Sequence, residues 1–270
     1  MLFRSESRGR GLGAGQGTRL PMIDLPWVRA SLPYRRVEWF PSIDSTMTEA
    51  ARLAREGAPS GTIVGADEQT QGIGRHGHSW HSEPAAGLYV SFILRLPIGA
   101  DALPLVMLSL GLAARDAIAE TSGLAPDLRW PNDVLLSGKK CAGILATKED
   151  DAIIAGIGIN VGHKAFPDDI AALATSLAIE GAVVSREAAL IALANQVDEV
   201  IEVLKTKGAD AICSLFAQAS SYVSGRRVRV DQGDKVIEGV TRGLDPFGFL
   251  IVRQDNGKDV TILAGGVRPT

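Results

Sequence analysis

Cysteine is scarce in this sequence, and long apolar runs are absent. Two cysteines, Cys141 and Cys213, are too few for a disulfide framework, so both are expected to be reduced thiols. No apolar run approaches the roughly 20 residues that a membrane-spanning helix needs. Residues 1–16 are rich in Gly and Arg and lack the apolar core of a signal peptide. We therefore expect a cytoplasmic protein with no membrane partner.

An excess of charge of one sign is also missing. The net charge is -3, with 22% charged and 46% hydrophobic residues, which is ordinary for a soluble globular protein. This balance gives no global attraction to nucleic acid, so any phosphate-binding group must come from a local cluster. At 270 residues, the chain can hold one large domain and one small domain.

Differences in composition and hydrophobic pattern along the chain divide it into three parts. We expect a disordered extension over 1–36, a main domain over 37–222 and a small domain over 223–270. In the main domain, helices are predicted over 46–56, 103–121, 185–204 and 209–219, and strands over 61–69, 87–96, 124–130, 140–147 and 152–161. Thr46 and Glu49 have the spacing of a capping box. In the small domain, strands over 226–230, 235–242, 249–253 and 259–263 predict an all-β barrel.

A glycine-rich loop at 72–77 satisfies the pattern G-x-G-x-x-G after a strand. A dinucleotide site needs a helix that begins at the third glycine, and the sequence from His78 to Pro84 cannot open one. The loop could still wrap a ligand, because glycines let backbone N–H groups approach an anion and Arg75 adds a cation. His76, His78 and His81 lie close together in sequence, but their spacing is not tied to a tetrahedral metal site, and we predict no metal ligand there.

Two further segments concentrate polar groups. The strand-turn-strand 129–140 carries Asn132 and Asp133 on its loop and Lys139 and Lys140 on the returning strand. By itself this segment fits a solvated, charged hairpin about as well as a site. The apolar strand that ends in 156–161 fits a tightly packed core strand, or a strand whose Asn160 contacts an adenine edge.

Taken together, six segments resemble the motifs of the biotin protein ligase family, in that family's order. They are Ser45-Thr46 before a helix, 69–77 leading to Trp80, 129–133, 139–145, 156–161 and 174–177. The match runs from about Trp39 to the C-terminus. Each segment is a modest signal, whereas the ordered set is specific.

The resemblance implies an α+β fold related to class II aminoacyl-tRNA synthetases and biotin synthetases. That fold has a mixed sheet with helices and a C-terminal SH3-like β-barrel. The implied substrates are ATP and biotin, with Mg²⁺, and the implied product is biotinyl-5'-AMP. The biotinyl group then passes to a lysine of the biotin carboxyl carrier protein or domain of acetyl-CoA carboxylase or a similar carboxylase. The family resemblance also allows a homodimer.

The same resemblance implies roles for individual residues. Lys140 bridges the biotin carboxylate and the α-phosphate, Arg75 holds the acyl-phosphate on a closing loop, and Asp133 orients or deprotonates the acceptor lysine. The implied biotin contacts are Ser45, Thr46, Gln69, Gly72, Arg75, Trp80, Lys140 and Gly143. The implied ATP contacts are Arg75, Asn132, Lys140 and Asn160, and no residue is predicted to ligate a metal.

Other functions of related proteins are weighed against this one. Bifunctional relatives carry an N-terminal helix-turn-helix, whereas the residues before Trp39 lack helical periodicity, so we expect the monofunctional form without specific DNA binding. A lipoate or octanoate ligase of the same fold would show an Arg-Arg-x-x-Gly-Gly-Gly loop, which this chain lacks. A catalytically silent binding module is the third alternative, because Ile73 stands where many relatives carry Arg.

Overall fold

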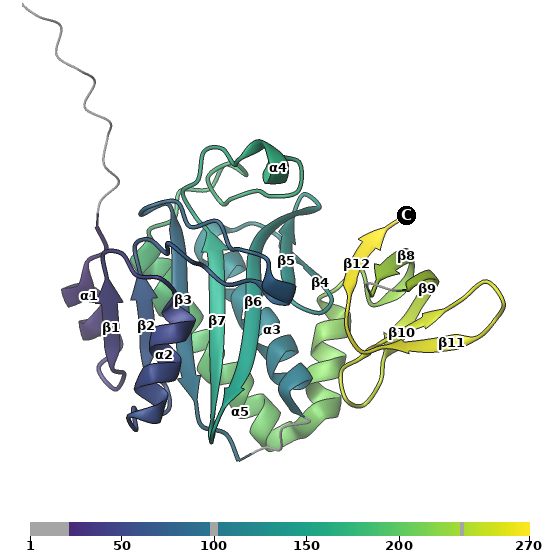
Figure 1. Ribbon diagram of the computed structural model, residues 1–270, viewed down its shortest axis with the longest axis horizontal. Coiled ribbons are helices and arrows are strands. Elements are labelled where there is room, and N and C mark those ends of the chain that lie inside the picture. The colour runs from purple at the N-terminus through teal and green to yellow at the C-terminus, as the bar shows by residue number, and fades with distance from the viewer. Residues whose placement is uncertain (1–21, 98–101, 233–234) are drawn as a thin grey trace, which may run out of the picture.

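The computed structural model describes residues 22–97, 102–232 and 235–270, which form two bodies built on separate sheets (Figure 1). The larger body contains a seven-stranded sheet in the order β1-β2-β3-β7-β6-β5-β4. Its strands are β1 Val37–Phe40, β2 Ile63–Ala66, β3 Gly87–Leu94, β4 Asp127–Arg129, β5 Asp133–Leu136, β6 Lys139–Glu149 and β7 Ala152–Asn160. Only β1 and β2 pair in parallel, so the sheet is mixed, as predicted.

Helices cover both faces of this sheet unequally. The long helices α3 (Leu103–Ser122) and α5 (Arg186–Gln218) cover one face, and the short helix α2 (Thr46–Arg55) covers part of the other (Figure 1). Helix α5 spans both of the predicted helices and is kinked between them at Gly208, whose φ of 74° is left-handed. A single turn, α4 (Asp168–Ala171), follows β7.

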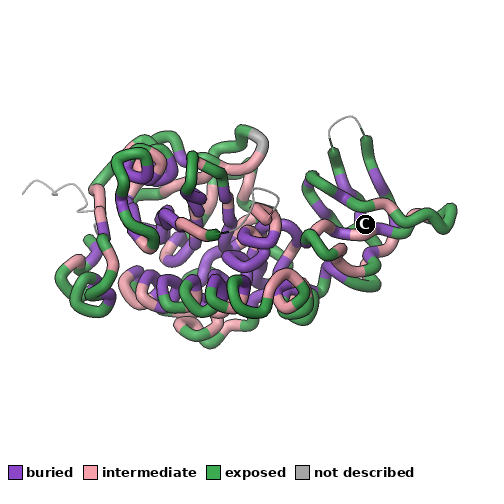
Figure 2. The backbone as a smooth tube through the Cα atoms, turned by 90° about the horizontal axis from the view of Figure 1, so that it is seen from below, coloured by how far each residue is buried: buried purple, intermediate pink, exposed green. Residues whose placement is uncertain are grey.

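The central strands are apolar on both sides because both sides are covered. In β3, Val90 and Phe92 pack toward α3 and α5, whereas Ile93 packs in the smaller core beneath α2. Figure 2 shows the buried backbone concentrated within the larger body. Because α2 has only ten residues, it covers only part of this face of the sheet. The loop between β2 and β3 covers the part that lies above α2 in Figure 1.

A helix precedes the first strand, at α1 (Leu25–Ser31). Its N-cap Asp24 accepts a hydrogen bond from the backbone N–H of Trp27 at 3.0 Å, a proline lies in the first turn, and Val28 is fully buried. The prediction of disorder over 1–36 is therefore wrong for 22–36, because an Asp cap followed by Leu and Pro starts a helix there. Residues 1–21 lie outside the described residues.

The C-terminal body is a five-stranded antiparallel sheet in the order β11-β10-β9-β8-β12. Its strands are β8 Ser224–Asp231, β9 Val236–Leu244, β10 Leu250–Arg253, β11 Asp259–Ile262 and β12 Gly266–Pro269. The four predicted strands are present, and β12 adds a fifth through the pairing of Val267 with Val230. Among the residues that the structure describes, β11 and β12 do not pair, so hydrogen bonds do not close this SH3-like sheet.

The two bodies share a buried apolar core, and a hydrogen bond lies at their junction. The indole Nε1 of Trp130 donates to the carbonyl oxygen of Gly248 at 2.9 Å, which joins the end of β4 to the turn between β9 and β10. A Cβ on Gly248 would lie 2.9 Å from a methyl carbon of Leu108, so glycine allows this turn to approach α3 closely. None of the described helices is both long and apolar enough to cross a membrane.

Candidate active site

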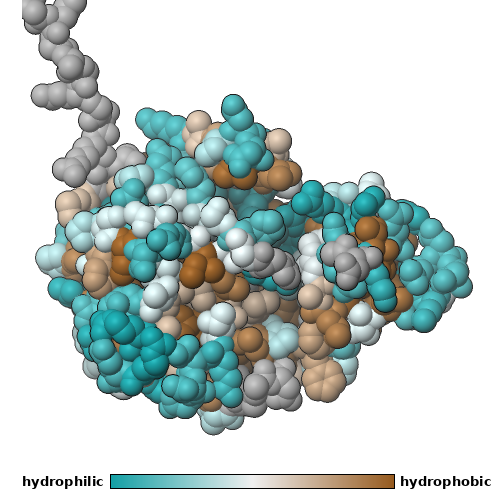
Figure 3. Space-filling view, in the orientation of Figure 1, coloured by the Kyte–Doolittle hydropathy of each residue, from teal (hydrophilic) through white to brown (hydrophobic). Residues whose placement is uncertain are grey.

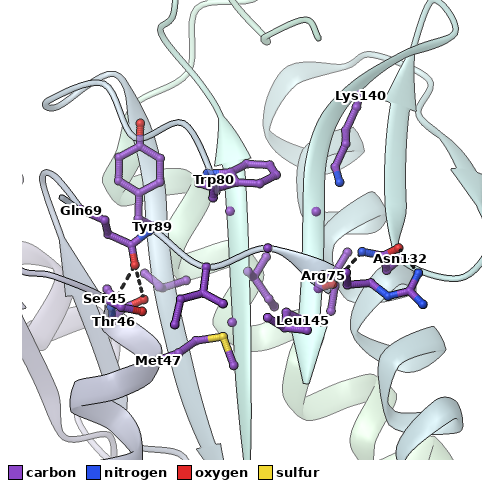
Figure 4. A pocket seen from close by; sticks show the side chains of 18 residues that line it. Ser45, Thr46, Met47, Gln69, Arg75, Trp80, Tyr89, Asn132, Lys140 and Leu145 are labelled. Atoms are coloured by element: carbon purple, nitrogen blue, oxygen red, sulfur yellow. Dashed lines mark hydrogen bonds between the residues drawn. The ribbon is translucent and has the colours of Figure 1, made fainter. Parts of the chain in front are cut away.

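A pocket opens on the sheet face that α2 covers only in part. Eighteen residues line it, and Figure 4 shows their side chains. They come from the start of α2, the loop between β2 and β3, strand β3, the residue before β5, and strands β6 and β7. That loop carries the short 3-10 turn Arg75–Gly77 and crosses in front of β7 and β6 (Figure 1). No α-helix begins at its third glycine, which agrees with the rejection of a dinucleotide site. On the same face of the molecule, Figure 3 shows apolar side chains bordered by polar ones.

Glycines form the floor of the pocket because large side chains lie directly on the strands. A Cβ added to Gly158 would lie 2.5 Å from the Trp80 ring, and one on Gly156 would lie 2.8 Å from Sδ of Met47. A Cβ on Gly143 would lie 2.8 Å from both Lys140 and Trp80. The glycines of β7 therefore admit two kinds of close neighbour: Gly156 lets the strand pack tightly on Met47 of helix α2, and Gly158 admits the indole of Trp80.

Three polar side chains meet at one end of the pocket, two from the start of α2 and Gln69 from the loop after β2. The carboxamide oxygen of Gln69 accepts from the backbone N–H of Thr46 at 2.9 Å and from its hydroxyl at 3.0 Å. Ser45 is the N-cap, yet its side chain makes no capping bond, and its buried Oγ has no partner. The predicted Thr46–Glu49 capping box does not form, because Thr46 is already the first helical residue and its hydroxyl is used by Gln69.

Cationic groups lie at the other end. The Nζ of Lys140 lies 2.5 Å from Oδ1 of Asp133 and 5.3 Å from the Trp80 ring centre. Arg129 donates to the second oxygen of Asp133, with the shorter bond at 2.7 Å. Burial alone would raise the pKa of Asp133, but the charges of Lys140 and Arg129 outweigh it and hold that pKa below its ordinary value. The carboxylate therefore stays ionised and fixes the lysine.

Arg75 reaches the same end from the covering loop. Its Nη1 donates to Oδ1 of Asn132 at 3.1 Å, while the Asn132 amide donates to the carbonyl of Ile144 at 2.9 Å. Burial lowers the pKa of Arg75, with Asp133 acting in the opposite direction, but a guanidinium remains charged at neutral pH. Asn132 thus connects the loop to β6. In Figure 4 the side chains of Arg75 and Asn132 lie together, far from Ser45.

Comparisons with known proteins match both bodies. Residues 39–163 match the model of the biotin/lipoate A/B protein ligase family, and residues 223–267 match the biotin protein ligase C-terminal domain. The bifunctional ligase/repressor BirA of Bacillus subtilis is 33% identical over 80% of this chain and 68% of its own length. The biotin–[acetyl-CoA-carboxylase] ligase of Mycobacterium tuberculosis is 30% identical over 89% and 91%.

The chain belongs to the biotin protein ligase family.

A solved structure agrees with this assignment. Biotin protein ligase from Aquifex aeolicus, in complex with biotin and ATP, has a TM-score of 0.77 at 32% identity and covers 87% of this chain and 99% of its own. The α+β fold predicted from the resemblance is thereby confirmed.

Most of the residues predicted for this biotin protein ligase line the pocket together. They are Ser45, Thr46, Gln69, Arg75, Trp80, Asn132, Lys140 and Gly143. Gly72 and Asp133 lie just outside the lining. Gly72 allows the loop to fold on itself, since a Cβ there would lie 2.7 Å from the carbonyl oxygen of Trp80. Asp133 lies behind Lys140.

Asn160 was predicted to contact ATP, but its side chain does not line the pocket. Its amide is buried and donates to the carbonyl of Thr175 at 3.0 Å, so it holds the segment that follows β7. That segment also pairs with β6, because Lys140 donates through its backbone N–H to Leu173 at 2.8 Å and accepts from Thr175 at 2.9 Å. The backbone around the lysine is therefore fixed on both sides.

Some lining residues of this family member were not predicted. They are Met47, Tyr89, Val90, Ile144, Leu145, Ile157 and the two glycines of β7. The glycines carried a usable signal, because two glycines within one apolar strand indicate a close neighbour. The apolar residues among them fit the pattern of core residues, and nothing in the sequence marked them as part of a pocket. Ile73 also lines the pocket, with 47% of its surface exposed, so an apolar side chain stands at the pocket edge in place of a cation.

Proposed function

We propose that this chain activates biotin with ATP to biotinyl-5'-AMP and transfers the biotinyl group to a lysine of a carrier domain. The observation that carries the proposal is the order of chemistry along the pocket, visible in Figure 4. Neutral polar groups at Ser45, Thr46 and Gln69 come first, an apolar stretch with Trp80 and Met47 follows, and the cationic end with Lys140 comes last. Biotin has a neutral ureido ring, an apolar chain and a terminal carboxylate in the same order.

The polar end fits a ureido head. The Oγ of Ser45 and the indole Nε1 of Trp80 are buried and unpartnered, and buried polar atoms of this kind normally have a hydrogen-bond partner. Ser45, Thr46 and Gln69 are proposed to bind the ureido group, with Gly72 shaping the loop around it. The indole of Trp80 covers the apolar chain above Gly143 and Gly158.

The cationic end fits the reacting groups. A carboxylate oxygen of biotin attacks the α-phosphorus of ATP, the bond to the pyrophosphate oxygen breaks, and a mixed anhydride forms. Lys140 is proposed to lie between the carboxylate and the α-phosphate, where it offsets their repulsion and the negative charge of the transition state. Asp133 holds the ammonium in place at 2.5 Å. Its lowered pKa makes it a weak base, so we assign it orientation of Lys140 and of the acceptor amine rather than proton removal.

The covering loop is proposed to protect the anhydride. Arg75 would bind the acyl-phosphate from above, and its bond to Asn132 would hold the loop closed and exclude water. In the second step the neutral amine of the carrier lysine attacks the acyl carbon, the bond to the phosphate oxygen breaks, AMP leaves, and the new amide nitrogen loses its extra proton to solvent. Asn160 would act on the nucleotide through the segment that it holds at Thr175.

Magnesium is proposed to arrive with the nucleotide. No carboxylate is among the pocket-lining residues that the structure describes, and Asp133 is engaged by two cations. These lining residues therefore form no protein cage for Mg²⁺, which in nucleotide sites binds largely to phosphate oxygens and water. When bound, the ion would neutralise phosphate charge.

The carrier is proposed to be the biotin carboxyl carrier domain of a carboxylase. Relatives from Mycobacterium tuberculosis and Paracoccus denitrificans bear the name biotin–[acetyl-CoA-carboxylase] ligase, and the latter is 32% identical over 94% of its own length. A carrier domain of acetyl-CoA carboxylase is the acceptor to test first.

Pyrophosphate release, measured with biotin, lipoate and octanoate in turn, tests the activity. We expect ATP- and Mg²⁺-dependent release with biotin alone, followed by a mass gain of one biotinyl group on the carrier lysine. Release with lipoate or octanoate instead would indicate the related lipoate-type ligase. Folded protein that releases pyrophosphate with none of the three would refute the proposal.

A further inference from the structure

A cluster of metal-binding side chains lies outside the pocket lining. His81 and Glu83 are on the loop that leads into β3, and His163 follows the end of β7. One ring nitrogen of each histidine and one carboxylate oxygen of Glu83 all lie within 4.8 Å of one another. In sequence His81 is a neighbour of His76 and His78, but the fold instead brings it to a histidine 82 positions further along the chain.

One ring nitrogen of the buried member of the cluster lacks a hydrogen-bond partner. His163 is fully buried, and its Nδ1 has no partner, although its Nε2 lies 3.2 Å from the hydroxyl oxygen of Tyr89. The Tyr89 hydroxyl donates its hydrogen to the carbonyl of Glu83 at 2.9 Å. Its oxygen must therefore accept from Nε2–H of His163. In this tautomer Nδ1 carries a lone pair, which is the form of a metal ligand.

The surroundings hold the His163 ring in place. Phe166 stacks on it with the ring planes 16° apart and the centres 5.1 Å apart, and the His81 ring centre lies at 5.9 Å. The hydroxyl of Tyr89 orients the ring as outer-shell partners orient histidine ligands in metal sites.

We propose that His81, Glu83 and His163 bind one divalent transition-metal ion of the zinc type. Two imidazoles and one carboxylate are an established donor set for zinc, with a fourth position left for water or another ligand. Imidazole nitrogen disfavours Mg²⁺ and Ca²⁺, which select oxygen ligands. The ion would tie the loop that carries Trp80 to the segment that follows β7. This site is distinct from the Mg²⁺ that accompanies ATP and does not depend on the proposed ligase activity.

Zinc binding by the full chain tests the proposal directly. The protein is stripped with a chelator, and Zn²⁺ is titrated against a competing chromophoric chelator. We expect one ion per chain, a loss of about 100-fold or more in affinity for His81→Ala and Glu83→Gln, and a loss of about tenfold for Tyr89→Phe. The matched control is His78→Ala, an exposed histidine of the same loop, which should bind like the unmodified chain.

Co²⁺ provides a second readout. The unmodified chain should give the visible absorption bands of a four-coordinate nitrogen and oxygen site, and Zn²⁺ should remove them. Circular dichroism establishes that each variant is folded, and Glu83→Gln keeps the proposal testable if a histidine variant is not. Absence of one-to-one binding by the unmodified chain would overturn the proposal. So would undiminished binding by both His81→Ala and Glu83→Gln, or an equal loss in His78→Ala.

Discussion

The ammonium of Lys140 lies 2.5 Å from one carboxylate oxygen of Asp133, while Arg129 occupies the other oxygen of the same group. The two cations come from β4 and β6, the strands on either side of β5, and Asp133 is the first residue of β5, so its carboxylate joins the three strands. Both charged ends of the pair are largely shielded, with 15% of the Asp133 side chain and 30% of the Lys140 side chain exposed. Removal of one partner from such a shielded pair costs more than removal of one from a surface salt bridge, because the other charge is left unpaired.

Replacement of Asp133 by Asn should lower stability in a pH-dependent way. The folded pKa of Asp133 lies below its ordinary value of about 4, so the ion pairs stabilise the fold above pH 4 and this contribution is lost as pH falls through the folded value. We expect a loss of about 2 kcal/mol at pH 7 in urea unfolding, which shrinks below pH 4. Asp255→Asn, in an exposed pair with Arg227, is the control with little effect. A pH-independent loss would contradict this account.

Lys140→Ala should abolish adenylation while leaving the fold intact. The reacting carboxylate and phosphate would lose their fixed cation, and removal of such an electrostatic group typically costs about 100- to 1,000-fold in rate. Pyrophosphate release with biotin is the measurement. Lys139→Ala is a matched control, because this neighbouring lysine is exposed on the other side of β6 and should retain activity. Equal activity of the two variants would refute the role of Lys140 as the cation at the reacting groups.

Arg75→Gly should release the intermediate. Without the guanidinium, the loop loses both its contact with Asn132 and its grip on the acyl-phosphate, so biotinyl-5'-AMP should escape and react with lysines other than the carrier's. Free biotinyl-5'-AMP is quantified by chromatography after single-turnover reactions. His78→Ala, on the same loop, should retain the intermediate like the unmodified chain. Intermediate that stays bound in Arg75→Gly would refute the assigned role.

Much of the framework follows from local patterns in the sequence. Apolar runs such as 152–161 predicted buried strands, and Ser185 predicted the start of a helix that the structure begins at Arg186. The pair Lys139 and Lys140 shows where local reasoning ends. Alternation along β6 requires that they face opposite sides, but it does not say which side is the pocket, and only the family resemblance favoured Lys140.

Features that depend on tertiary contacts could not be predicted from local sequence patterns. The meeting of His81 with His163 requires that β3 and β7 be neighbours, which no local pattern reveals. Similarly, Ser45 has the residue type and position of an ordinary helix cap, and only the fold shows that its hydroxyl makes no capping bond. The sequence also does not show what the Asn160 amide binds, since its partner Thr175 lies in a separate segment.

Gly158→Val should impair biotin binding without unfolding the sheet. A Cβ at this position would lie 2.5 Å from the Trp80 ring, so the indole must move away from the pocket floor. We expect the KM for biotin to rise at least tenfold with a smaller change in kcat, because the apolar wall contributes to binding more than to chemistry. Gly162→Ala is the control, since its nearest added contact would be an ordinary 3.5 Å. An unchanged KM would show that the indole position is unimportant.

Trp130→Phe should loosen the C-terminal domain. The phenyl ring retains most of the apolar burial of Trp130 but cannot donate to the carbonyl of Gly248, which is then left without its buried partner. A loss of about 1–3 kcal/mol in stability is expected from an unsatisfied buried acceptor. Because this bond joins the two bodies, limited proteolysis should also release a fragment that begins near Tyr222 faster than in the unmodified chain. Trp27→Phe, at an exposed tryptophan on α1, serves as the control. If Trp130→Phe matches that control in both unfolding and proteolysis, the contact between the bodies must be held by apolar packing of residues such as Leu108 instead.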